Sequence, residues 1–263
     1  MTVKRVAGAV LLTALVPLSC TSAPAIEAAR GPASSTPAAT GATPESGDSA
    51  IPSSGGSAPT EDVRARFDGR VSALPSTLVR EMRGTTWKPG CPVPLTDLRL
   101  LRFNYWGFDG EIERGPMVVH EDVAADVLWV FGRLFNARFP VKRVALAKEF
   151  EPEEFEPRIS SRRSVTAAFN CRPVVTPLGP GDDFSQHAHG LAVDINPVQN
   201  PFVTGDGFVR NRMSRPYLDR GRRLTGMIHP GDVVVRSFAA MGWSWGGHWS
   251  DGKDYMHFSL TGG

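Results

Sequence analysis

The sequence lacks a strong excess of charge of either sign, with a formal net charge of only +2 over 263 residues. So small an excess does not provide the basic surface that nucleic-acid binding needs, so we expect no nucleic-acid partner. Internal repeats are also absent. A composition of 41% hydrophobic and 21% charged residues is typical of a globular protein. The length is sufficient for one sizeable core.

Long hydrophobic runs are missing as well. The apolar stretch at residues 6–18 is shorter than the roughly 20 residues that span a bilayer. Lys4 and Arg5 precede it and small residues follow, which predicts an export signal over residues 1–20. The stretch ending at Cys20 resembles a lipobox, except that Pro17 stands where Leu is usual. We therefore expect an exported cell-envelope protein. It would be lipid-anchored through Cys20 at the outer face of the membrane, or secreted to the wall.

Cysteine is scarce, with three in the chain. Apart from Cys20, only Cys91 and Cys171 remain, and two cysteines in an exported chain favour a disulfide. The alternative is that Cys171 is a metal ligand or a nucleophile, but a better ligand set exists without it. Large apolar residues are almost absent from residues 21–60, which are rich in Ala, Pro, Ser and Gly. Such a segment cannot bury enough surface to order itself, so we expect a disordered tether.

The folded domain is expected over residues 61–263, and its helical and strand patterns do not alternate regularly. A doubly wound sheet is therefore excluded and an α+β fold is predicted. Apolar periodicity predicts helices at residues 74–82 and 121–139 and strands at 98–106, 117–120 and 141–147. Further short elements are expected at 165–170, 191–195, 233–238 and 255–260, with an acidic loop at 151–157 and an arginine-rich insertion loop at 210–223.

Two short segments, residues 185–196 and 251–259, concentrate His, Asp and Gly. If residues 255–260 form a strand, alternation places His257 on the face opposite to the core residues. The same argument places Asp194 on the outward face of its own strand. Gly190 can make the turn that brings His187 back over Asp194.

Two imidazoles and one carboxylate around an open fourth position form a catalytic zinc arrangement. Zn²⁺ is therefore the expected cofactor, with His187, Asp194 and His257 as its ligands. A nearby carboxylate would then accept a proton from water as a general base. Asp254 has the better spacing from His257, if it lies in the turn before the strand, and Asp251 is a second candidate.

The pattern Ser185-x-His187-x-x-Gly190-x-Ala192-x-Asp194 resembles the zinc motif of the VanY-like D-alanyl-D-alanine carboxypeptidase family. Three other segments within residues 164–260 also resemble this family: Asp254-Tyr255-Met256-His257-Phe258, Phe169-Asn170-Cys171-Arg172 and Trp243-Ser244-Trp245-Gly246-Gly247.

The resemblance implies the Hedgehog/D,D-peptidase fold, a small antiparallel sheet flanked by helices with zinc in a surface cleft. It implies Asp254 as the base, and Arg172 as the cation that binds or polarises the substrate carbonyl. Ser185 and Trp245 are the further candidates for substrate contact, although Ser185 equally suits a structural role and Trp245 a place in the core or cleft wall. A structural ion pair is the other interpretation of Arg172.

The sequence departs from the family at His189, where relatives often carry Tyr. On a strand His189 would share a face with His187, so a ligand set using both is one alternative, but a substrate-contact or surface role is the interpretation we prefer for His189. His248 is a second departure, and a place lining the cleft is the interpretation we prefer for it.

The first functional hypothesis is a monomeric zinc metallopeptidase that hydrolyses peptidoglycan stem peptides. Removal of terminal D-Ala and cleavage inside the stem, as between L-Ala and D-Glu, both stay open. The second hypothesis is a non-catalytic, zinc-stabilised cell-wall-binding module. The presence of Asp254 together with Arg172 favours the first.

Overall fold

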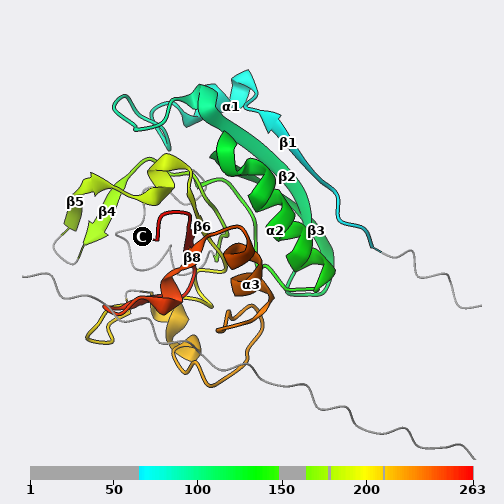
Figure 1. The fold of residues 1–263 in the computed structure, drawn as a ribbon, viewed down its shortest axis with the longest axis vertical. Helices are drawn as coiled ribbons and strands as arrows, with labels where there is room; N and C mark the ends of the chain where they lie inside the picture. The colour runs from blue at the N-terminus through cyan, green and yellow to red at the C-terminus, as the bar shows by residue number, and fades with distance from the viewer. Residues whose placement is uncertain (1–64, 148–163, 177–178, 210, 263) are drawn as a thin grey trace, which may run out of the picture. The chain divides into compact units, whose positions relative to one another are not determined.

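The computed structural model describes residues 65–147, 164–176, 179–209 and 211–262 (Figure 1). The chain divides into two units, Met1–Thr60 and Glu61–Gly263, and all described residues belong to the second. The predicted export signal, the lipidation at Cys20, the tether and the acidic loop at 151–157 lie outside the described residues. Among the helices that the structure describes, none has the length and hydropathy needed to cross a membrane.

A three-stranded antiparallel sheet forms the first layer, in the order β1 (Gly69–Ala73), β2 (Leu98–Trp106) and β3 (Ile112–His120). The bounds of β2 are those predicted from its alternating pattern, and β3 begins five residues before the predicted strand. No pattern in the sequence predicts β1, because most of its residues are exposed on an edge strand. Apolar and polar residues alternate recognisably in a sequence only where one face of the strand is buried and the other is exposed.

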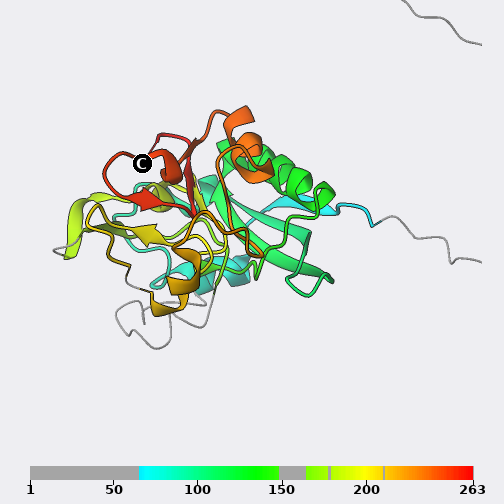
Figure 2. The same cartoon turned by 90° about the horizontal axis from the view of Figure 1, so that it is seen from below.

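Helix α2 (Ala124–Asn136) covers one face of this sheet, and α3 (Val233–Ala240) lies beside α2 (Figure 2). The helix predicted at 121–139 is confirmed, although its first turn is a 3₁₀ helix, η2 (Glu121–Val123). Its apolar stripe faces β2, where Phe131 stacks on Phe103 at 4.3 Å between ring centroids. The short element at 233–238 is α3, whose N-terminus is capped by the Asp232 carboxylate. Helix α1 (Ser76–Met82) and the 3₁₀ helix η1 (Leu95–Asp97) precede β2.

The second three-stranded sheet has the order β6 (Ala192–Asp194), β10 (His257–Ser259) and β8 (Ser244–Trp245). Two antiparallel pairs complete the strands: β4 (Pro173–Thr176) with β5 (Gly179–Phe184), and β7 (Phe202–Val203) with β9 (Lys253–Asp254). Three more 3₁₀ helices are η6 (Gln186–His189), η7 (Arg212–Tyr217) and η8 (Gly246–His248). The fold is thus a mixed α and β structure with small antiparallel sheets and few helices, as the α+β prediction requires. Within the described part of the chain the strands nevertheless form four small sheets and not one.

The predicted strand at 141–147 is wrong. This segment makes only isolated bridges, such as Val144 with Thr166, because its neighbour at 165–170 is itself irregular. The segment at 165–170 instead runs beside β6, through the bridge between Ala167 and Asp194. The element at 255–260 is also shorter than predicted, since Tyr255 bonds to the carbonyl of Pro201 and lies outside the sheet.

One hydrophobic core joins the two three-stranded sheets through α2 and α3. Phe258 of β10 is fully buried and stacks on Phe238 of α3, with ring centroids 4.3 Å apart. Its neighbours along the strand, His257 and Ser259, consequently point to the other face. The core therefore determines which side of β10 carries the polar residues.

Candidate metal centre

His257 and Asp194 are directly opposite each other on the antiparallel strands β10 and β6. Residues so paired point to the same face with their Cβ atoms about 5 Å apart. His257 Nδ1 lies 3.1 Å from Asp194 Oδ1. Their inward neighbours, Phe258 and Val193, have no exposed surface. Both residues therefore lie on the strand faces that alternation predicted, opposite to the core.

His187 comes from η6, just before β6. The Ser185 hydroxyl caps this 3₁₀ helix by accepting a hydrogen bond from His187 N. Gly190 ends it in the left-handed region, with φ of 69°, and its carbonyl accepts a bond from His120 N. Ser185 therefore acts on the helix backbone, and the turn expected at Gly190 is present. Because the segment is helical and not extended, His189 does not share the face of His187.

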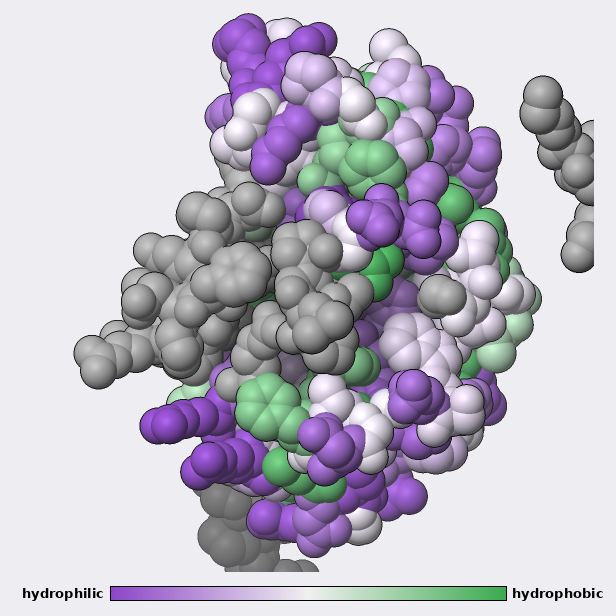
Figure 3. Space-filling model, turned by 90° about the vertical axis from the view of Figure 1, so that its left-hand side faces the viewer, coloured by the Kyte–Doolittle hydropathy of each residue, from purple (hydrophilic) through white to green (hydrophobic). Residues whose placement is uncertain are grey.

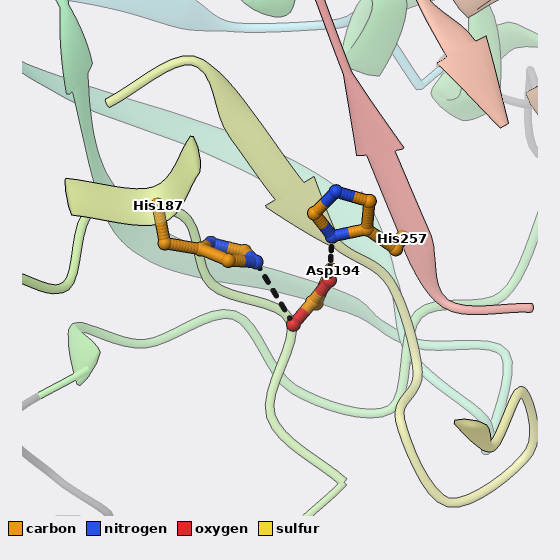
Figure 4. A group of neighbouring side chains, drawn as sticks. All are labelled: His187, Asp194 and His257. Carbon is orange, nitrogen blue, oxygen red and sulfur yellow. Dashed lines mark hydrogen bonds and ion pairs between the residues drawn. The ribbon is translucent and has the colours of Figure 1, made fainter. Parts of the chain in front are cut away.

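A backbone carbonyl orients the imidazole of His187. Its Nδ1 donates to the carbonyl of Ala168 at 2.7 Å, which leaves the lone pair of Nε2 pointing forward. Nε2 is buried, lies 3.3 Å from Asp194 Oδ2 and makes no hydrogen bond. Figure 4 shows the two histidines on either side of the carboxylate, each facing one of its oxygens.

These three side chains form a group that could hold a divalent metal ion. One ligand atom from each, two imidazole nitrogens and one carboxylate oxygen, lie within 4.8 Å of one another. A buried nitrogen with an unused lone pair is costly unless something binds it. The donor set and this orphaned Nε2 fit a metal with three protein ligands and one open position.

The two histidines of this group determine the ionisation of Asp194. Burial acts to raise the pKa of Asp194, but the neighbouring imidazoles of His187 and His257 act in the opposite direction and outweigh burial. They hold the pKa of Asp194 well below its usual range. Asp194 is therefore an anion at neutral pH, as a metal ligand must be.

Asp254 lies beside the metal group, but in a different sheet. It belongs to β9 and pairs with Phe202 of β7, whereas a turn position was expected. Its Oδ1 is buried without a hydrogen-bond partner. Burial and the charge of Asp194 raise the pKa of Asp254 to about 7, although His257 and Arg172 act in the opposite direction. A carboxyl with such a pKa can accept and release a proton near neutral pH.

Arg172 carries a cation whose charge acts on Asp254. Its guanidinium is partly buried and donates to the carbonyl of Pro173 at 3.2 Å. It forms no ion pair with a carboxylate of the described residues. The preceding Cys171 is bonded to Cys91, which confirms the predicted disulfide and excludes Cys171 as a metal ligand.

Trp245 was expected at the substrate but packs in the core, with 3% of its surface exposed. Its indole N–H donates to the carbonyl of Tyr255 at 2.9 Å, so no polar group remains for a substrate. His248 is exposed and its ring packs against Trp245, outside the metal group. Asp251 is exposed as well, which makes it a poorer base than Asp254.

Sequence reasoning missed three contributors to this site. The carbonyl of Ala168 orients His187, the ring of Trp249 lies 5.5 Å from that of His257, and Phe202 lies opposite Asp254. A backbone carbonyl leaves no trace in a residue pattern. Trp249 belongs to a recognisable run of Trp and Gly residues, but its contact with His257 could not be predicted from the sequence.

Residues 179–260 match the family model described as D-alanyl-D-alanine carboxypeptidase, a family of peptidases. This match confirms the VanY-like resemblance for the segment that carries His187, Asp194, Asp254 and His257. The segment with Arg172 lies before the matched residues, so the role carried over to it stays a prediction. No curated protein and no solved structure gave a significant match.

Proposed function

We propose that the chain is a zinc-dependent peptidase that hydrolyses peptidoglycan stem peptides, on a fold of the Hedgehog/D,D-peptidase type. The observation that carries this proposal is the buried His187, Asp194 and His257 group with Asp254 beside it, inside the segment that matches the peptidase family. A structural zinc site would have four protein ligands, whereas this group has three.

Zinc, when bound, supplies Lewis-acid activation of water and of the peptide carbonyl. His187 and His257 would hold it through Nε2 and Nδ1, and Asp194 through a carboxylate oxygen. The Ala168 carbonyl maintains the His187 tautomer that this requires.

Asp254 is proposed as the general base. In its anionic form it takes a proton from the attacking water, and in its protonated form it returns that proton to the leaving amine. Its burial favours the second form and the charges of His257 and Arg172 favour the first, so both forms are accessible near neutral pH. Arg172 is proposed to meet the negative charge that develops on the carbonyl oxygen.

The site of action is proposed to be the cell envelope, where an exported monomer would meet its substrate. The anchor at Cys20 remains a proposal on the lipobox-like residues alone. Both cleavage specificities remain open, because Arg172 suits either a terminal carboxylate or an internal carbonyl.

Purified stem peptides incubated with the zinc-loaded full chain test the proposal, with products weighed by mass spectrometry. Loss of one alanine mass identifies a carboxypeptidase, and a new internal amine identifies an endopeptidase. A chelator should abolish either product and added Zn²⁺ should restore it. An unchanged substrate at every metal concentration, with zinc demonstrably bound, would favour the non-catalytic wall-binding module instead.

A further inference from the structure

The segment between β7 and α3 carries a concentration of exposed arginine that the peptidase site does not use. Four exposed guanidinium groups follow one another along it, and none forms an ion pair or hydrogen bond with a described residue: Arg212, Arg215, Arg222 and Arg223. The acid in this stretch, Asp219, is occupied by the backbone N–H of Gly221. We call residues 208–209 and 211–223 the arginine loop.

The same loop also exposes large apolar side chains. Phe208 is 60% exposed, Met213 53% and Leu218 39%. Single exposed apolar residues are ordinary, but such residues interleaved with unpaired arginines mark an interaction surface. At the lower end of the face drawn in Figure 3, where Figure 1 places this segment, strongly hydrophilic and hydrophobic residues lie next to one another.

The 3₁₀ helix η7 arranges these residues on two outward ridges. With three residues per turn, positions three apart eclipse each other. Ser214 is fully buried, so its ridge faces the protein. The other two ridges face solvent, one basic with Arg212 and Arg215, and one apolar with Met213 and Pro216. Basic and apolar groups are thus presented together on the outside of the loop.

A partly buried arginine attaches the loop to the elements that carry the proposed site. Arg220 donates to the carbonyls of Gln199 and Tyr217, to Asn200 Oδ1 and to the carbonyl of Ile228. Its guanidinium also stacks on the ring of Tyr255, 4.2 Å from the centroid. Tyr255 directly follows Asp254. The exposed arginines therefore project from a loop held in place next to the proposed base.

From these observations we infer that the arginine loop docks the domain on an anionic lipid surface. Arginines attract acidic headgroups, and their aliphatic stems together with Phe208, Met213 and Leu218 can enter the boundary between headgroups and acyl chains. An anionic wall polymer would neutralise the arginines equally well but offers no apolar phase for the other three side chains. This inference does not rest on the proposed peptidase activity.

The test uses the full chain with vesicles of phosphatidylglycerol or of phosphatidylcholine, and reads amide hydrogen exchange peptide by peptide. Protection of residues 208–223 by the anionic vesicles, reversed by high salt and absent with phosphatidylcholine, is the expected result. This local readout separates the loop from any binding through the apolar N-terminal residues. Binding of the chain with no protection of the loop would overturn the inference.

Variants sharpen the test. The Arg212→Gln/Arg215→Gln double variant should lose about 25-fold in partitioning to anionic vesicles, roughly fivefold for each arginine. The matched control is Arg70→Gln/Arg80→Gln, which removes the same charge from exposed positions on β1 and α1 and should bind as the wild type does. Phe208→Ser/Met213→Ser should also weaken vesicle binding.

The apolar variant distinguishes the two anionic partners. If Phe208→Ser/Met213→Ser binds vesicles as tightly as the wild type, or if the loop is protected by phosphate-rich wall polymer and not by vesicles, the lipid surface is the wrong partner. Unchanged zinc content and unchanged melting temperature of each variant show that the fold is intact. The wild-type comparison of the two lipids needs no variant at all.

Discussion

At the scale of single residues, the metal group depends on what each side chain does with its second polar atom. His187 uses Nδ1 on the Ala168 carbonyl, and Asp194 directs one oxygen to each histidine. Three ligand atoms are thereby oriented toward one point before any metal arrives. Asp254, by contrast, keeps a buried oxygen with no partner, which is the state expected of a group that must change its protonation during a reaction.

Asp254→Asn should lower kcat by roughly 10²–10⁴, because the amide cannot accept the proton of the attacking water. Zinc content should remain that of the wild type, since Asp254 is not among the three ligands. The measurement is the turnover of a stem peptide together with metal analysis of the same sample. Asp251→Asn, at an exposed position, is the control and should retain activity. Turnover that survives in Asp254→Asn would remove Asp254 from the mechanism.

The raised pKa of Asp254 also predicts how stability depends on pH in the metal-free protein. The pKa is about 7 when folded and 3.8 ordinarily, so between these values the folded state binds the extra proton. The stabilisation that Asp254 contributes is full below the lower pKa and is lost as the pH rises through the higher one. Asp254→Asn does not titrate. The free energy of unfolding of Asp254→Asn, relative to that of the wild type, should therefore rise by roughly 2–3 kcal/mol as the pH is raised from about 5 to about 8.

Urea unfolding with a chelator present measures this difference. A stability difference that stays constant over this pH range would show that the Asp254 carboxyl is not buried as described.

At the scale of elements, the turn at Gly190 connects η6 to β6 and sets the distance between His187 and Asp194. Its φ of 69° favours glycine, and a Cβ here would lie 2.6 Å from His120 N, a backbone atom that cannot move aside. The close approach exists because Gly190 O accepts a hydrogen bond from that same N–H. One backbone contact thus couples β3 of the first sheet to the metal group.

Gly190→Ala should destabilise the protein by more than the roughly 1–2 kcal/mol of left-handed backbone strain alone, and should weaken zinc binding. Gly207→Ala is the matched control, because Gly207 has φ of 83° with no atom within 4 Å of the added Cβ. It should show the backbone strain and normal zinc affinity. Denaturant unfolding and zinc titration measure the two quantities. Equal effects from both variants would mean that the contact with β3 is unimportant.

At the scale of the whole domain, the Cys91–Cys171 disulfide connects two regions far apart in sequence. It spans 80 residues and lies in a second hydrophobic cluster with Leu78 and Met82 of α1. Cys171 also follows Asn170, whose N–H bonds to the carbonyl of His187. The disulfide therefore attaches the N-terminal part of the domain to the irregular segment that packs behind the metal group.

Reduction, or the Cys91→Ser/Cys171→Ser variant, should cost roughly 4 kcal/mol of stability on the chain-entropy account of a loop this long. Zinc should still bind to the folded fraction in its original stoichiometry, because neither sulfur belongs to the ligand group. Urea unfolding and metal analysis are the measurements. Loss of zinc from protein that remains folded would show that the disulfide acts directly on the site.

Some features followed from the sequence alone because they depend on local periodicity. Burial of Phe258 and Val193 forces His257 and Asp194 to the opposite face, and Gly190 supplies the backbone freedom that returns His187 to them. The candidate metal group, the long helix α2, strand β2 and the disulfide were predictable for this reason, or because few cysteines left few pairings.

Other features were decided only when distant segments packed together. The β9 strand carries Asp254 but pairs with β7, some fifty residues away, and its two residues are too few to show a period. Burial of Trp245, the orientation of His187 by the Ala168 carbonyl and the pKa of Asp254 likewise arise from neighbours that no spacing encodes. The sequence determined which side chains could bind a metal. Tertiary packing determined their dielectric surroundings and hydrogen-bond partners, because both depend on segments that are adjacent in space and not in the chain.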